Sequence, residues 1–127
     1  MSFIAALERP DTFAGAIPQS GFAEFGYYDR IINWEGDVRP AMYVVHGAID
    51  DDVCIDCRPG GTCGIQPGRR CGTVASSDAI VEALRMRGWN DSNLVYARLD
   101  NVAHRWQPWL NETWWQFMVD QLAEVQP

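Results

Sequence analysis

An aspartate and a histidine follow separate strand-like segments and could act together in proton transfer. Asp50 comes just after an apolar run, residues 41–46, that breaks at Gly47. His104 lies in the loop after a second extended segment, residues 93–99. A carboxylate that accepts a hydrogen bond from one imidazole nitrogen fixes the tautomer of the ring and makes the other nitrogen available as a general base. The two residues therefore predict acid–base chemistry, provided that the fold brings them together.

A nucleophile for such a pair is harder to find in the sequence. Ser20 follows a short apolar run at residues 14–18, so it would lie at the same sheet edge and is the candidate nucleophile within this chain. The favoured alternative is a turn serine that bonds local backbone. No G-x-S-x-G sequence occurs, and the strained turn that presents the serine of many hydrolases is therefore missing. His46, the other histidine, is expected to hydrogen-bond the acid loop as a structural residue.

The elements that would position these residues alternate between helical and extended patterns. Three helices are expected: one at residues 1–8, one that Ser76 or Ser77 caps and Gly88 ends, and one that Asn111 caps. The last helix would carry an apolar stripe of Trp114, Met118, Leu122 and Val125. Strands are expected at residues 14–18, 41–46 and 93–99, and residues 22–40 would form an irregular connection with about one helical turn. This order favours parallel βαβ crossovers and an α/β fold. Active sites of open α/β sheets collect at the carboxyl ends of the strands, where both polar residues would meet.

The composition limits what the chain can do. Its 127 residues suit one domain, and its 17 acids against 10 bases argue against a nucleic-acid or anionic-membrane partner. All ten basic residues are arginines, which excludes Schiff-base chemistry and a Walker-type phosphate loop, since both need a lysine amine. No apolar run approaches the roughly 20 residues of a membrane span, and no signal-peptide pattern opens the chain. We therefore expect a soluble protein with no membrane partner.

The two motifs together resemble the C-terminal half of an α/β-hydrolase, in the secreted esterase branch of polyhydroxybutyrate depolymerases and feruloyl esterases. The H-G-x-x-D-x-x-V acid loop of that branch is matched from His46 through Asp50 to Val53, and its H-x-W segment by His104 and Trp106. The resemblance covers nearly all of the chain but only about half of the family's fold. It implies a partial α/β-hydrolase fold with a mainly parallel sheet of about three strands, flanking helices and a single domain over the whole chain.

The resemblance also implies a function and a place of action. Asp50 would be the acid and His104 the base of a serine carboxylic-ester hydrolase, while the nucleophile and the oxyanion hole would lie in an N-terminal half outside this chain. The partner would be an ester substrate, no cofactor is implied, and the location would be secreted or periplasmic. Trp106 and Trp109 would line the substrate site, although packing of the last helix onto the sheet is the favoured explanation for the tryptophans in this region.

Four cysteines share one polar loop at residues 54–71, namely Cys54, Cys57, Cys63 and Cys71. Two disulfides would cross-link a loop too polar to pack by itself, and this interpretation is favoured. A zinc or other thiophilic metal site is the alternative, although only one C-x2-C pair is present where structural zinc usually joins two, and free thiols remain a third option.

A different class of function follows from the missing half. Half of a hydrolase sheet exposes an edge that other strands would cover, and proteins resolve such edges by pairing. We therefore expect a homo-oligomer closed through this edge and residues 1–8. The alternatives to an esterase portion are thus a catalytically inactive oligomeric binding or assembly module, and a small protein with a metal site in the cysteine loop.

Overall fold

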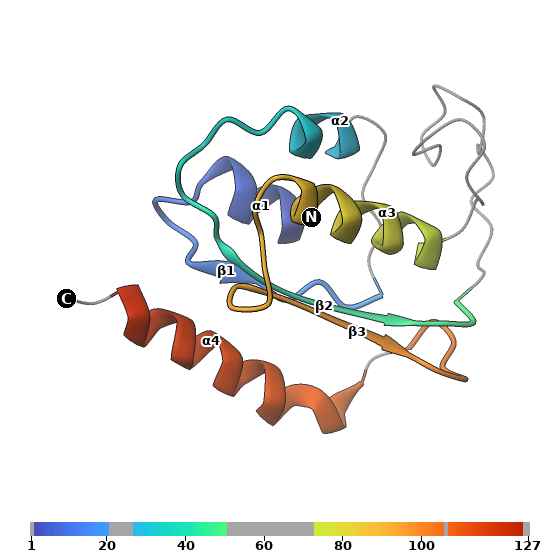
Figure 1. Cartoon of the computed structure of the whole chain (residues 1–127). Coiled ribbons are helices and arrows are strands. Elements are labelled where there is room, and N and C mark those ends of the chain that lie inside the picture. Colours follow the sequence, from blue (N-terminus) through green and yellow to red (C-terminus); the bar gives the residue numbers. More distant parts are fainter. Residues whose placement is uncertain (1, 21–26, 51–72, 106, 126–127) are drawn as a thin grey trace.

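The computed structural model describes residues 2–20, 27–50, 73–105 and 107–125. Its elements are, in order, α1 (Ser2–Glu8), β1 (Gly15–Ala16), α2 (Tyr27–Ile32), β2 (Ala41–Gly47), α3 (Thr73–Met86), β3 (Leu94–Leu99), the 3-10 turn η1 (Pro108–Leu110) and α4 (Asn111–Val125). Figure 1 shows α1, α2 and α3 on one side of the sheet and α4 on the other. Within the described segments, no helix has both the length and the apolar character that crossing a membrane requires.

The three strands form one parallel sheet in the order β1-β2-β3, which confirms the predicted α/β class and its parallel crossovers. β1 is shorter than expected and pairs with the start of β2 at Gly15 and Ala16. The segment after it still follows β2, because the carbonyl of Pro18 accepts the Val45 amide at 2.9 Å and the Ser20 amide donates to the Val45 carbonyl at 2.8 Å. Ser20 therefore ends beside the carboxyl-terminal part of β2.

β2 is the centre of the molecule, and all seven of its residues are buried. Side chains alternate between the two faces of a strand, so Met42 and Val44 join the core under α3, while Tyr43 makes an edge-to-face contact with Phe117 of α4 at 5.4 Å between ring centroids. A continuous apolar run at residues 41–45 is typical of a strand covered on both faces.

α3 begins earlier than its sequence suggested. Thr73 opens the helix, so the prediction that Ser76 or Ser77 caps it is wrong. Both serines are buried in its second turn, on the face that also carries Ile80 and Leu84. The end of the helix agrees with the prediction, because Gly88 follows it with φ of +94°, a conformation that glycine adopts without strain.

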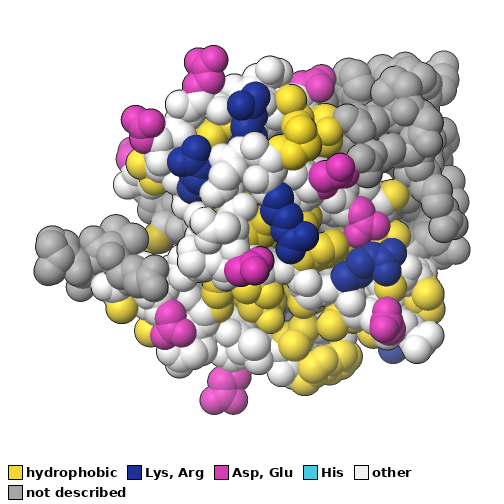
Figure 2. Space-filling model, in the orientation of Figure 1, with side chains coloured by type: hydrophobic (Ala, Val, Ile, Leu, Met, Phe, Trp, Pro, Cys, Tyr) yellow, Lys and Arg dark blue, Asp and Glu magenta, His cyan; other side chains and the backbone are white. Residues whose placement is uncertain are grey.

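The capping residue and the buried stripe of α4 also differ from expectation. Asn111 has helical φ and ψ of −57° and −43°, and its amide bonds the Pro108 carbonyl, so it continues η1 into α4 rather than capping the helix. The half-buried side facing the sheet carries Trp114, Phe117 and Met118. Leu122, predicted to lie in the stripe, is 49% exposed. Figure 2 shows hydrophobic and acidic side chains both reaching the surface along this part of the molecule.

Gly47 marks a close approach between the ends of β2 and β3. A Cβ atom there would lie 2.2 Å from the carbonyl oxygen of Val102 and 2.7 Å from that of Ala103. These are backbone atoms of the loop that carries His104, so the space cannot be made by turning a side chain. Only glycine allows the two loops to meet in this way.

We predict that Gly47→Ala lowers the free energy of unfolding by about 1–3 kcal/mol, because the added methyl group displaces the backbone of residues 102–103. Urea denaturation followed by circular dichroism would measure the change. Ile49→Ala is the control: its side chain, in the same turn, is 54% exposed, so we expect a change of less than about 0.5 kcal/mol. Equal effects of the two substitutions would contradict the steric explanation.

Candidate active site

Asp50 and His104, which the sequence placed at one sheet edge, are in direct contact. Nδ1 of His104 lies 2.9 Å from Oδ2 of Asp50. The Asp50 side chain is completely buried, whereas that of His104 is 51% exposed. The imidazole therefore has one nitrogen on a buried carboxylate and a substantial surface open to solvent. General-base catalysis by a histidine needs an accessible imidazole of this kind together with a reacting group within hydrogen-bond reach.

Backbone hydrogen bonds hold the two loops together. The Ala48 amide donates to the Leu99 carbonyl at 2.8 Å, and the Ile49 amide donates to the Val102 carbonyl at 3.1 Å. They extend the β2–β3 pairing beyond the strands into the turn that ends at Asp50. The contact between Asp50 and His104 is thus fixed by sheet register as well as by the side chains.

His46 lies under this pair and contacts Asp50 from the other side. Its ring is fully buried, with Nε2 at 2.8 Å from the same Asp50 Oδ2 and Nδ1 at 2.7 Å from the hydroxyl of Ser77. Burial lowers the pKa of His46, and this effect outweighs the opposing influence of Asp50. His46 is therefore neutral near pH 7. The hydrogen bond from His46 to the acid loop agrees with the sequence-based expectation.

The role of Ser77 is the feature of this site that sequence reasoning missed. The sequence predicts that Ser76 or Ser77 caps α3, yet the Ser77 side chain is 1% exposed and meets His46. Its spacing from Ile80 and Leu84, at three and seven positions, places it on the buried face of the helix. This spacing indicates that Ser77 faces the core, whereas the preference of serine for helix starts indicates a cap, and the cap prediction followed the second signal.

Ser20 lies next to the histidine loop. Its hydroxyl donates to the carbonyl of Arg105, the residue after His104, at a long distance of 3.5 Å. Its φ of +46° falls in the left-handed region, which is uncommon for serine and costs backbone energy. The expected position at the same edge of the sheet is therefore observed, whereas the hydroxyl bond goes to backbone 85 positions away and not to the local backbone of a turn.

The remaining predicted residues are away from the contact or outside the described part of the chain. Trp109 is exposed and borders a hollow of about 700 Å³ between α4 and the sheet. Trp106, Val53 and the candidate disulfide or metal residues Cys54, Cys57, Cys63 and Cys71 lie outside the described residues. In the part that is described, no group of three or more His, Cys, Asp or Glu side chains is arranged to hold a metal ion.

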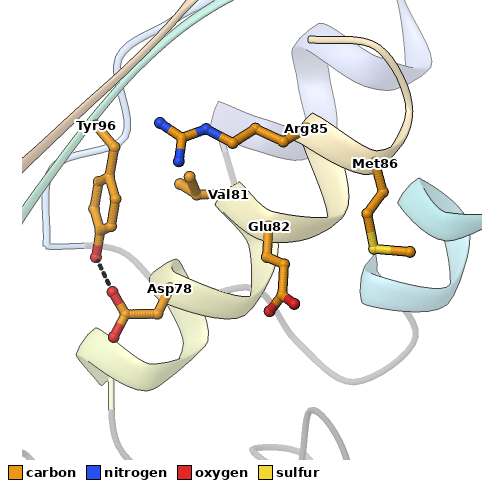
Figure 3. Close-up of a pocket in the computed structure, with 6 residues that line it drawn as sticks. All are labelled: Asp78, Val81, Glu82, Arg85, Met86 and Tyr96. Carbon is orange, nitrogen blue, oxygen red and sulfur yellow. Dashed lines mark hydrogen bonds between the residues drawn. The ribbon is translucent and has the colours of Figure 1, made fainter. Parts of the chain in front are cut away.

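A second hollow, of about 460 Å³, lies between α3 and β3 (Figure 3). The Tyr96 hydroxyl donates to Asp78 at 2.6 Å, and burial together with this bond raises the pKa of Tyr96. Arg98 donates to the same carboxylate oxygen at 3.1 Å. Neither Asp50 nor His104 borders either hollow, so the Asp50–His104 contact forms a separate site at the strand ends.

Comparison of the chain with protein-family models, curated proteins and solved structures finds no significant match. What is established is a small parallel α/β fold with a buried carboxylate between two imidazoles.

We predict that the free energy of unfolding falls as the pH is lowered from 7.5 to 5.5. In the unfolded chain His46 takes up a proton near its ordinary pKa of about 6.5, whereas the folded state keeps it neutral to lower pH. The unfolded state therefore binds more protons below that pH, with a slope of at most about 1.4 kcal/mol per pH unit for one group. Urea denaturation across this range would show it.

The control for this pH dependence is His46→Gln, which replaces the imidazole with an amide that can still form hydrogen bonds but cannot titrate. Its stability should be lower at pH 7.5 and change less between pH 7.5 and 5.5. An identical pH slope in both proteins would show that His46 is not the group responsible.

Proposed function

We propose that this chain supplies the acid and the base of a serine carboxylic-ester hydrolase, with Asp50 as the acid and His104 as the base. The observation that carries the proposal is the 2.9 Å contact between Asp50 Oδ2 and His104 Nδ1 at the carboxyl ends of neighbouring parallel strands. The match to the H-G-x-x-D and H-x-W motifs of the esterase branch supports the same assignment.

In the proposed mechanism, Asp50 orients the imidazole ring and His104 transfers the proton. With Nδ1–H donated to Asp50, Nε2 of His104 is the nitrogen that takes the proton of a serine hydroxyl as the hydroxyl attacks the ester carbonyl. The ring becomes an imidazolium, which the buried carboxylate stabilises because water does not screen it. The same proton then passes from Nε2 to the leaving alkoxide.

The nucleophile and the oxyanion donors are proposed to come from polypeptide outside this chain. The chain has no G-x-S-x-G sequence, and a triad without its nucleophile loses most of its rate enhancement. Ser20 is the alternative nucleophile within this chain, because its backbone is strained and it lies beside the loop that carries His104. The experiment therefore includes a Ser20 variant.

We predict no saturable hydrolysis of p-nitrophenyl butyrate by the chain alone. Joined to an upstream hydrolase half that carries G-x-S-x-G, it should turn over the ester, and Asp50→Asn or His104→Ala should lower kcat by about 10⁴-fold. Ser20→Ala is the matched control and should leave kcat within a few-fold. Hydrolysis by the isolated chain that both His104→Ala and Ser20→Ala abolish would instead assign the nucleophile to Ser20.

A second candidate function is an oligomeric assembly module, and one surface favours it. Trp115, Val119 and Leu122 lie on one flank of α4 and are 62%, 39% and 49% exposed. They adjoin Met118, whose side chain lies against Gly15 of β1. In the described sheet, β1 is an outer strand, so an apolar helix flank and a strand edge lie side by side.

The expected partner of this surface is a second copy of the chain. The apolar side chains Phe3 and Leu7 of α1, the helix expected to contribute to the interface, are buried in this chain's own core, so the surface described above belongs to α4 and not to α1. Apolar surface of this kind favours association. A strand edge adds backbone donors and acceptors that a second sheet can pair.

We predict that light scattering at micromolar concentration shows a dimer or larger oligomer, and that Val119→Glu shifts it toward monomer. Val38→Glu is the control, because Val38 is 57% exposed and lies outside α4, and it should leave the mass unchanged. A monomeric wild-type protein would count against the assembly function without bearing on the esterase proposal.

A further inference from the structure

Behind the Asp50–His104 contact runs a chain of three buried side chains that starts on α3. The Ser77 hydroxyl is 2.7 Å from His46 Nδ1, and His46 Nε2 is 2.8 Å from Asp50 Oδ2. We infer that Ser77 and His46 are positioning residues that hold the Asp50 carboxylate in the orientation from which it fixes the His104 ring. The inference rests on the proposed function of Asp50 and His104 and extends it to residues on a third element.

Both imidazoles contact the same oxygen atom of Asp50. His104 Nδ1 lies 2.9 Å from Oδ2, and His46 Nε2 lies 2.8 Å from it. A carboxylate oxygen accepts hydrogen bonds, so each ring must present an N–H to it. His46 is therefore the Nε2–H tautomer and His104 the Nδ1–H tautomer. Movement of either ring displaces the acceptor that the other ring uses.

Ser77 completes the set of hydrogen-bonding partners of His46. A neutral imidazole whose Nε2 donates has an acceptor at Nδ1, and the Ser77 hydroxyl supplies the donor. Without it, a fully buried nitrogen would lose its hydrogen bond, which costs more than the bond itself contributes. The hydroxyl thereby sets the rotation of the ring and aims Nε2 at Asp50.

α3 holds Asp50 at two points. The Val74 amide donates to the Asp50 backbone carbonyl at 3.3 Å, and Ser77 reaches the Asp50 side chain through His46. The helix is itself fixed by Ile80 and Leu84, which are fully buried in the core between α3 and the sheet. A group that must keep one orientation is best supported by a rigid element of this kind.

The experiment is long-range ¹H–¹⁵N NMR of the histidine side chains at pH 7.5, which observes the tautomers directly. In the wild-type chain we expect Nε2–H at His46 and Nδ1–H at His104. Ser77→Ala should lower the ratio of Nδ1–H to Nε2–H at His104 by roughly fivefold, the change that corresponds to one hydrogen bond. Ser77→Thr keeps the hydroxyl and should restore the ratio.

Ser76→Ala is the matched control, since it removes a hydroxyl that is equally buried on the same helix, and it should leave His104 unchanged. A double-mutant cycle tests the route. In a His46→Gln background, Ser77→Ala should no longer alter His104, because Ser77 acts through His46. The amide spectrum of each variant reports whether it is folded.

The outcomes separate this inference from the proposed function. If wild-type His104 is not the Nδ1–H tautomer, the Asp50 contact is wrong and both fail. If it is, and Ser77→Ala leaves its tautomer ratio unchanged in a folded protein, the positioning inference is overturned while the acid and base assignments stand. An equal response to Ser76→Ala and Ser77→Ala would also overturn it, because the effect would then be one of general packing.

Discussion

The carboxylate of Asp50 places a negative charge where water does not reach, and the ends of two strands and the start of a helix are organised around it. An isolated buried charge would be costly, so it must be met by hydrogen-bond donors. Here two imidazole N–H groups converge on one of its oxygens. Each imidazole is in turn held by something else: His46 by burial and Ser77, and His104 by the backbone pairing of its loop with the turn that leads to Asp50. The register of β2 against β3 therefore determines whether His104 reaches the charge of Asp50.

This arrangement divides the molecule into a supporting side and an exposed side. His46 and Ser77 lie in the layer between the sheet and α3, among apolar side chains that keep them dry and in one conformation. His104 lies at the surface, where a reacting group can approach it. Low local dielectric strengthens the bonds on the buried side, while solvent access on the other side allows proton exchange. A neutral inner histidine beside an accessible outer one follows from this difference in burial alone.

Much of the fold could be predicted because its signals are local. The continuous apolar run of β2, the alternation in β3 and the glycine after α3 each act within a few residues, and β2, β3 and the end of α3 form as expected. The predictions that failed concern residues whose local preference competes with tertiary packing. Ser76 and Ser77 have the residue type of a helix cap, but they lie on the buried face of α3. Asn111 also has this residue type, but it continues the preceding 3-10 turn into α4. The positions of Asp50 and His104 after two strands predicted that their side chains would meet. No short-range pattern indicates that Ser77 contacts His46, which lies 31 positions away in the sequence.

The shared oxygen of Asp50 has a consequence for protein engineering. Grafting the acid and base of this chain onto another α/β scaffold would commonly mean transferring two side chains to the ends of adjacent strands. In this protein the aspartate takes its orientation from a histidine inside β2 and a serine in the second turn of α3, and Gly47 sets the gap between the two loops. The smallest portable unit is thus five residues on three segments, and a graft of the two alone would leave the carboxylate without the contacts that aim it.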